Sequence, residues 1–318
     1  MQDLSNSAVP NGATPQARTT AVLFVGLGTM GLPMATNLVR AGFAVVGADS
    51  DAAAVARLAN AGGGPTADAR EAARTSDVVV TMLPDDRAVT AVLGGERGVI
   101  AAMRHGALVV EMSTTAPSTK IALARFAKER GVDFVECPVG RTAEHAVAGT
   151  LALMAGGDVA AIERARPLLA ALGNELHVCG DVGAGSAMKL VNNALVACVN
   201  AASIEALVAG AKAGLTLELM LGVFKTTMAW NNALATGLPK KALRRDFAPG
   251  FMTALAHKDV GLALRMAREL DVRMPQSEGA YALLAEALAH GYARDDTPGS
   301  MLRVREADGG VELSLQAR

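Results

Sequence analysis

The segment that decides the fold is residues 21–49, which read AVLFVGLGTMGLPMATNLVRAGFAVVGAD. Its first apolar run, residues 22–25, has the composition of a buried parallel strand. The run leads into three glycines spaced Gly-x-Gly-x-x-Gly and then into a helical pattern that ends at Gly42. A second apolar run, residues 43–46, leads to Asp49. Strand, glycine turn, helix and strand in this order predict the first half of a dinucleotide-binding fold.

Each part of this segment has a task in holding a dinucleotide. Gly26 permits the tight turn, Gly28 lets the backbone approach a pyrophosphate, and Gly31 lets the helix lie close to the strand. The N-terminus of the helix offers free N–H groups to the phosphates. A carboxylate at Asp49 accepts hydrogen bonds from both ribose hydroxyls and repels a 2′-phosphate, and no arginine follows it closely, so we expect NAD(H) rather than NADP(H). The cofactor-binding residues predicted from this segment are Gly26, Leu27, Gly28, Thr29, Met30, Gly31 and Asp49.

Composition excludes several classes of protein. A chain of 318 residues can hold two domains, and a net charge of −1 without a lysine-arginine run argues against a nucleic-acid partner. Three distant cysteines and five scattered histidines predict neither a disulfide framework nor a metal site.

No uninterrupted apolar stretch reaches the ~18 residues of a membrane-spanning helix. Residues 1–19 are polar and lack the pattern of a signal peptide, so we expect a disordered extension on a cytoplasmic protein with no membrane partner.

Strand and helix patterns alternate through the first domain, residues 20–182. This alternation predicts an α/β Rossmann-type, doubly wound domain. Ligands of such sheets lie beyond the carboxyl ends of the strands. Leu83, Pro84, Ser113 and Thr114 follow two of these strands, so we expect them to border the cofactor. The further strands are predicted at residues 78–83, 108–112, 134–136 and 151–155.

The pattern then changes to an all-helical domain, residues 183–305. Residues 184–213 are mostly apolar and predict one long interdomain helix, buried on nearly all sides. An apolar helical domain also suggests a homodimer or homotetramer. Residues 306–318 are expected to form a loose tail. Further helical segments are predicted around residues 216–229, 251–270 and 276–291.

The second domain opens on a segment with chemical potential, Gly183-x-Gly185-x-x-x-Lys189-x-x-Asn192-Asn193. Lys189 and Asn193 are four residues apart and share one helix face. An ammonium near a nicotinamide can donate a proton to a carbonyl oxygen as hydride reaches its carbon. Asn193 would orient the lysine, and Asn192 would bind a substrate hydroxyl or anion. The alternative is a lysine whose ammonium reaches solvent at the helix edge.

Two more clusters carry charge. Gly140, Arg141 and Thr142 combine a guanidinium, a hydroxyl and backbone N–H groups, which suits an anion, although a surface arginine in a salt bridge fits the same pattern. Lys258 belongs to His-Lys-Asp-Val-Gly, residues 257–261, and could reach the cofactor. A solvated helix face explains this Lys-Asp pair equally well.

Taken together, these motifs resemble those of the β-hydroxyacid dehydrogenase family over about residues 20–305. The matching segments are GLGTMGLPMA at residues 26–35, residues 183–193, and HKDVGLAL at residues 257–264. The resemblance implies that Lys189 is the general acid/base and Asn193 its partner. It also implies that Lys258 and Phe251 lie near the nicotinamide.

The substrate motif departs from the usual family pattern. Most members have Ser-Gly-Gly where this chain has Gly140-Arg141-Thr142. This version is similar to that of members that reduce sulfonated aldehydes, and a sulfonate offers three acceptor oxygens to the guanidinium and hydroxyl. The resemblance implies NADH-dependent reduction of 3-sulfolactaldehyde to 2,3-dihydroxypropane-1-sulfonate, or the reverse oxidation. Val196 stands where a small polar residue would be expected in that subgroup.

Two alternatives remain open at this point. The first is a relative that acts on a carboxylate, such as tartronate semialdehyde, 3-hydroxyisobutyrate or succinic semialdehyde and its product 4-hydroxybutyrate, because Arg141 would serve a carboxylate too. The second is a non-catalytic dinucleotide-binding module, which need not keep Lys189. Imine-reducing relatives usually lack this lysine, so its presence disfavours them.

Overall fold

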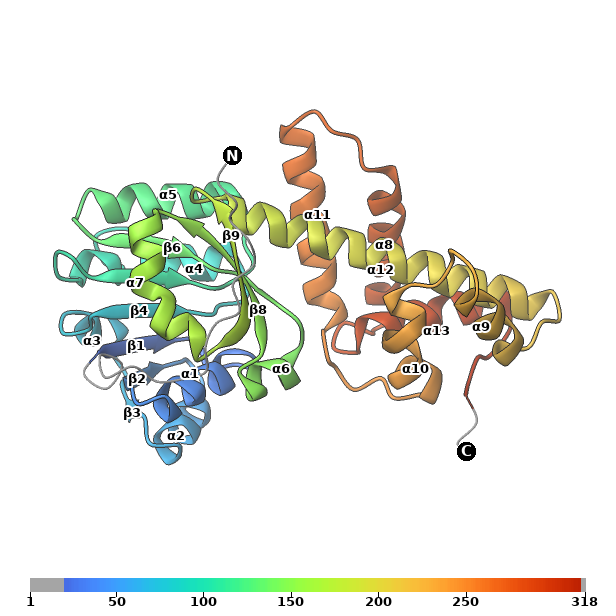
Figure 1. The fold of residues 1–318 in the computed structure, drawn as a ribbon, viewed down its shortest axis with the longest axis horizontal. Helices are drawn as coiled ribbons and strands as arrows, with labels where there is room; N and C mark the ends of the chain where they lie inside the picture. The colour runs from blue at the N-terminus through green and yellow to red at the C-terminus, as the bar shows by residue number, and fades with distance from the viewer. Residues whose placement is uncertain (1–19, 316–318) are drawn as a thin grey trace. The chain divides into compact units, whose positions relative to one another are not determined.

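A computed structural model describes residues 20–315 of the chain (Figure 1). By their contacts the described residues form two compact units, which divide between Lys189 and Leu190. The predicted disordered extension, residues 1–19, lies outside the described residues.

The first unit is built on a nine-stranded sheet with the order β3-β2-β1-β4-β5-β6-β8-β7, in which β9 also pairs with β8. Strands β1 to β6 are parallel to one another, whereas β8 runs antiparallel to β6 and β7. The chain order reverses between β1 and β4, which is the switch point of a doubly wound sheet. The strands are β1 (Ala21–Val25), β2 (Ala44–Ala48), β3 (Gly64–Pro65), β4 (Val78–Thr81), β5 (Leu108–Glu111), β6 (Asp133–Glu136), β7 (Val139–Gly140), β8 (Leu151–Gly157) and β9 (Gly173–Gly180).

Alternation along β1 explains how the sheet is covered on both faces. Val22 and Phe24 belong to one apolar core cluster, whereas Leu23 and Val25 belong to another, because successive side chains of a strand point to opposite faces. Helices α1 and α7 contribute to the first cluster, and α4 and α5 contribute to the second. The helices of this unit are α1 (Gly31–Arg40), α2 (Ala52–Asn60), α3 (Ala69–Ala73), α4 (Asp86–Leu93), α5 (Pro117–Lys128), α6 (Ala143–Ala148) and α7 (Val159–Ala170).

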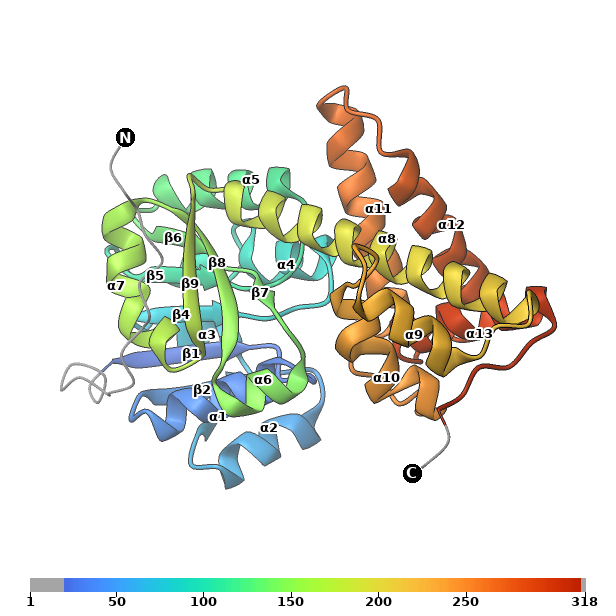
Figure 2. The same cartoon turned by 45° about the vertical axis from the view of Figure 1, so that its right-hand side comes forward.

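The second unit is helical, as predicted. Its core joins Ile204 and Leu207 of the long helix α8 to Leu264, Leu284 and Leu302 of three later helices. Helices α11 and α12 pack side by side (Figure 2). The helices are α8 (Ala184–Lys212), which begins in the first unit, α9 (Leu217–Lys225), α10 (Leu238–Lys240), α11 (Thr253–Glu269), α12 (Pro275–Ala289) and α13 (Thr297–Gly309), with short 3₁₀ and π turns between α9 and α11.

Helix α8 differs from its prediction in one respect. It is less completely buried than its composition indicated, because Met188, Val191, Leu195 and Val196 expose 44–65% of their surface in the single chain. Among residues 20–315 it is also the one helix long and apolar enough to cross a membrane by length and composition. A core helix passes the same test, and α8 supplies side chains to the core of the second unit, so we describe it as a core helix.

The carboxyl-terminal residues contradict the prediction of a loose tail as far as the structure describes them. Helix α13 continues to Gly309, and Leu313 is 4% exposed. The Glu306 carboxylate accepts a hydrogen bond from the backbone N–H of Leu313 at 2.7 Å and pairs with Arg245. The pair with Arg245 joins residues that are 61 positions apart in sequence, which is why the local pattern does not reveal it. Strand β9 and helix α13 were also not predicted.

The packing of α1 against β1 generates the first prediction. A Cβ at position 31 would lie 1.9 Å from the carbonyl oxygen of Gly26, whereas one at position 28 would meet no atom within 4 Å. Gly31→Ala should therefore lower the free energy of unfolding by about 1–3 kcal/mol, and Gly28→Ala should leave it within about 0.5 kcal/mol. Denaturant unfolding of both variants checks this, and equal stabilities would contradict it.

Candidate active site

The glycine turn borders a cavity of about 340 Å³. The Asp49 side chain follows β2 and accepts a hydrogen bond from the backbone N–H of Leu27 at 2.6 Å and from that of Asp51 at 2.8 Å. Asp49 therefore stabilises the glycine turn through the backbone of Leu27, and it also lines the cavity. The lining residues are Leu27, Gly28, Thr29, Leu32, Pro33, Asp49, Asp51, Ala54 and Arg57.

This cavity and the turn beside it fit a dinucleotide. Gly28 is exposed, and open space surrounds its backbone, so a diphosphate can approach closely. Among the described residues no side chain caps α1 at Met30, which leaves the N–H groups of the first turn for phosphate oxygens. The Asp49 carboxylate keeps lone pairs for ribose hydroxyls. NAD(P) bound here would be held by residues 26–31 and Asp49.

The structure adds to this cavity a cation that the sequence analysis missed. Arg57, on α2, lines the cavity, and its guanidinium lies 3.4 Å from the Asp51 carboxylate. No arginine directly follows Asp49 in the sequence, but α2 brings Arg57 back to the cavity. An arginine at this place can accompany a 2′-phosphate, so the argument for NAD(H) from Asp49 alone is incomplete.

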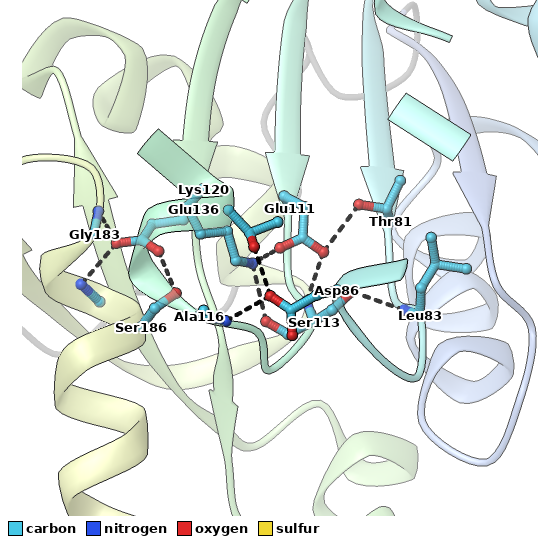
Figure 3. A network of polar contacts seen from close by, with 12 residues as sticks. Thr81, Leu83, Asp86, Glu111, Ser113, Ala116, Lys120, Glu136, Gly183 and Ser186 are labelled. Atoms are coloured by element: carbon cyan, nitrogen blue, oxygen red, sulfur yellow. Dashed lines mark hydrogen bonds and ion pairs between the residues drawn. The ribbon is translucent and has the colours of Figure 1, made fainter. Parts of the chain in front are cut away.

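Two of the residues predicted to border the cofactor are bonded to each other. The backbone N–H of Leu83, after β4, donates to the Ser113 hydroxyl, after β5, at 2.8 Å (Figure 3). Thr114 is half-buried and Pro84 is exposed. The two loops at the carboxyl ends of neighbouring strands therefore form one continuous edge, as the doubly wound topology requires.

The start of α8 is fixed by a buried carboxylate. Glu136, at the end of β6, accepts hydrogen bonds from the N–H groups of Gly183 at 2.6 Å and Gly185 at 2.8 Å, and from the Ser186 hydroxyl (Figure 3). A negative charge at this end of a helix is also favourable to the helix dipole. Lys189 follows one turn later and is 8% exposed. A lysine this buried does not fit the alternative of an ammonium that reaches solvent.

Position 185 requires glycine because the neighbouring backbone leaves no room for a side chain. A Cβ at this position would lie 2.3 Å from the carbonyl oxygen of Met154 in β8. The first turn of α8 therefore rests directly on the sheet. The glycines of the segment that begins at Gly183 set the distance between the sheet and the turn that carries Lys189.

Arg141 is held in an unusual way. Its backbone adopts a left-handed conformation with φ of 77°, which costs about 1–2 kcal/mol for a residue with a Cβ. Its guanidinium donates to the Thr150 carbonyl at 2.5 Å and to the Asn174 side chain at 2.7 Å, and it pairs with Glu175. The sequence left open an anion site or an arginine in a salt bridge, and the structure shows the salt bridge, with Glu175 as the partner. The adjoining Thr142 hydroxyl lies 3.1 Å from His145 Nδ1.

The asparagine pair and the Lys-Asp pair meet in the second unit. Asn193 donates to the Asp259 carboxylate at 2.6 Å, and its own carbonyl oxygen accepts from Asn192 at 3.1 Å. Lys258 pairs with the other oxygen of Asp259 at 2.8 Å. Asp259 is 2% exposed, so the solvated-face interpretation of this pair is wrong. Asp259 is a candidate site residue that the sequence analysis did not select, although it directly follows Lys258. Phe251, predicted near the nicotinamide, is partly exposed just before α11.

Other titratable groups near these segments offer less chemistry. Burial raises the pKa of the Cys137 thiol far above its ordinary value, so it is not a nucleophile at neutral pH. Burial lowers the pKa of His257, whose ring stacks on Tyr281 with centroids 4.2 Å apart. Within residues 20–315 no three His, Cys, Asp or Glu side chains are grouped as a metal site.

A doubly wound domain with a dinucleotide cavity, followed in sequence by a long helix that carries a buried lysine and by a helical domain, defines a class of dinucleotide-dependent oxidoreductases. Residues 21–180 match the family model described as the NAD binding domain of 6-phosphogluconate dehydrogenase. Residues 183–304 match that described as NAD-binding of NADP-dependent 3-hydroxyisobutyrate dehydrogenase. The chain belongs to the β-hydroxyacid dehydrogenase family, and it is an NAD(P)-dependent oxidoreductase that acts on a CH–OH group.

Individual relatives are similar over almost their whole length. The chain is 38% identical to 3-sulfolactaldehyde reductase of Escherichia coli (strain K12), over 91% of this chain and 97% of the relative. It is 37% identical to 2-(hydroxymethyl)glutarate dehydrogenase of Eubacterium barkeri, over 92% and 96%. The solved structure of Mycobacterium tuberculosis 3-hydroxyisobutyrate dehydrogenase with L-serine is similar with a TM-score of 0.84 and 33% identity, over 90% and 99%. The family is therefore established, whereas these similar identities do not separate the substrates.

Proposed function

We propose that the protein catalyses the NADH-dependent reduction of 3-sulfolactaldehyde to 2,3-dihydroxypropane-1-sulfonate, and the reverse oxidation. The observation that carries this proposal is Arg141, a cation kept at a strained backbone position in the segment predicted to bind substrate. A strained residue persists only where the surrounding structure and its use maintain it. The 38% identity to 3-sulfolactaldehyde reductase supports the same substrate.

The chemistry we propose uses few groups. Bound NADH supplies the hydride to the aldehyde carbon. Lys189 donates a proton to the aldehyde oxygen, and the neutral amine takes it back in the oxidation. Asn193, four residues along α8, orients the lysine, while its own amide is oriented by Asp259. Gly140, Arg141, Thr142 and Asn192 bind the anionic end of the substrate and its hydroxyl.

A carboxylate substrate is the second candidate, and one observation favours it. The Arg141 guanidinium already holds a carboxylate, that of Glu175, so its position suits a planar anion as well as a tetrahedral one. Tartronate semialdehyde, 3-hydroxyisobutyrate and succinic semialdehyde with 4-hydroxybutyrate belong to this class. In either case the substrate anion competes with Glu175 for the guanidinium.

We also propose a cytoplasmic homodimer or homotetramer. The support is the apolar surface of α8, where Met188, Val191 and Leu195 recur at helical spacing and are each at least 44% exposed. Such side chains are typically covered in an assembly. A mass in solution equal to one chain, measured by light scattering, would contradict this assembly.

Removal of the proposed acid should mainly reduce turnover. Lys189→Met keeps the length of the side chain and removes its proton, so kcat should fall about 10²-fold or more while NADH binding is retained. Steady-state kinetics with saturating NADH, together with NADH titration, checks this prediction. Turnover near that of the unmodified enzyme would remove Lys189 from the acid role.

Substrate choice tests the proposal directly. We expect kcat/KM for 3-sulfolactaldehyde to exceed that for tartronate semialdehyde and succinic semialdehyde by about 100-fold, which corresponds to almost 3 kcal/mol.

Arg141→Met should raise KM for the sulfonate about 10- to 100-fold, because charge-assisted hydrogen bonds are lost. Glu175→Gln should lower this KM about two- to fivefold, because it removes the competing anion of an exposed pair. A preference for a carboxylate would keep the family and discard the sulfonate.

Preference for NADH is the remaining proposal for this site, and its support is the Asp49 carboxylate that lines the cavity. Asp49→Ala should lower the ratio of kcat/KM for NADH over NADPH about tenfold, because loss of one charge and its ribose bonds removes about 1.4 kcal/mol. Arg57→Met is the matched control and should raise the same ratio. An unchanged ratio in Asp49→Ala would refute the ribose role.

A further inference from the structure

We propose that the buried ion pair between Lys120 and Glu111 is a positioning device for the nicotinamide half of the dinucleotide. It would act through the two loops that follow β4 and β5. The inference depends on the dinucleotide lying along these loops, and it is independent of the identity of the substrate.

The pair itself is fully enclosed. The side chains of Glu111, at the end of β5, and Lys120, in the first turns of α5, are both 0% exposed and form an ion pair (Figure 3). Burial of two charges is costly, and a well-packed apolar pair of similar volume often gives equal or greater stability. Stability alone therefore does not account for this pair, and its directional hydrogen bonds need a separate explanation.

Those bonds converge on Ser113. The Glu111 carboxylate accepts from the backbone N–H of Ser113 at 2.9 Å, and the Lys120 ammonium donates to the Ser113 carbonyl at 3.0 Å. The Ser113 hydroxyl is occupied as well, since it accepts from the N–H of Leu83 at 2.8 Å. All three polar groups of Ser113 thus point into the protein. Ser113 was predicted above as a cofactor contact. In this proposal it is a positioning residue, which fixes the backbone of Leu83 through its hydroxyl and that of Thr114 as its neighbour in sequence.

The same carboxylate reaches the neighbouring strand. Glu111 also accepts from the Thr81 hydroxyl, at the end of β4, at 3.2 Å. A second brace joins the helices behind the loops, where Asp86 of α4 accepts from the N–H of Ala116 at 2.9 Å and the Thr119 hydroxyl at 2.6 Å. The buried pair therefore holds the ends of β4 and β5 in a fixed arrangement, with Glu111 as the acceptor and Lys120 as the donor.

The topology decides which half of the dinucleotide meets these loops. A doubly wound sheet binds one nucleotide at each half, on either side of the switch point. The cavity with Asp49 belongs to the half that contains β1 and β2. The loops after β4 and β5 belong to the other half, so they face the nicotinamide nucleotide. Loss of the pair should weaken NADH without affecting a ligand that ends at the diphosphate.

The test compares two ligands on full-length protein. In the double variant Lys120→Met/Glu111→Leu neither charge is left unpaired, so the fold should be retained. We expect the dissociation constant of NADH, followed by its fluorescence, to rise about tenfold, the effect of one or two lost hydrogen bonds. The dissociation constant of ADP, measured by calorimetry, should stay within twofold.

The control is a second acid–base pair, which is exposed and lies outside the loops. Glu163 and Arg166 form a two-bond pair on the surface of α7, with distances of 2.6 and 2.8 Å. The variant Arg166→Met/Glu163→Leu should change neither dissociation constant. If the Lys120/Glu111 double variant does not fold, Ser113→Ala takes its place, since it removes only the acceptor for Leu83, and the same contrast between NADH and ADP is expected.

Each other outcome overturns the inference. Equal weakening of NADH and ADP would mean general damage to the fold, and unchanged NADH binding would mean that the pair does not position the loops. Neither titration contains substrate, so failure of the enzyme to reduce 3-sulfolactaldehyde would overturn the proposed function and leave this test intact.

Discussion

The Glu136 carboxylate is the interaction on which the rest of the candidate site depends. It ends β6, and the chain that leaves it leads within a few residues to Gly140, Arg141 and Thr142, which were predicted to bind substrate. Its two oxygens also hold the backbone of Gly183 and Gly185 and the hydroxyl of Ser186. One buried anion thus sets the starting point of the substrate segment and the register of the helix turn that leads to Lys189. The three donors satisfy the charge, which is the condition for burying it.

Paired charges are a recurring feature of both units. Lys120 faces Glu111, Lys258 faces Asp259, Arg141 faces Glu175, and Arg57 faces Asp51. The two most buried of these carboxylates, Glu111 and Asp259, also accept hydrogen bonds that orient other groups. The two arginine pairs are more exposed, and there a bound anion would exchange one partner for another. The buried pairs are suited to holding a fixed geometry, whereas the exposed pairs are suited to releasing their cation to a ligand.

Several features of the fold could be predicted because their causes are local. The glycine spacing, the apolar runs of β1, β4 and β5, and the helical domain all follow from periodicity over ten to thirty residues. Strand β9 was missed because its apolar positions are few, with polar residues between them, and it is stabilised by pairing with β8. Helix α13 was missed because its contacts, such as that between Glu306 and Arg245, lie far away in sequence. Asp259 was missed for the same reason, since its contact with Asn193 joins residues 66 positions apart.

The sequence by itself determined the family, the dinucleotide turn and the residues offered for chemistry, since each of these is encoded in residue type at fixed spacing. Only the tertiary structure decided which charges are already paired and which side chains are buried. From the sequence, Arg141 could be an anion-binding cation or part of a salt bridge, and the fold gives it Glu175 as partner. Asp259 was one half of a surface-like pair and is buried against Asn193. The physical reason is that electrostatic partners are set by distance in space, which strand order and helix packing fix and which spacing along the chain does not.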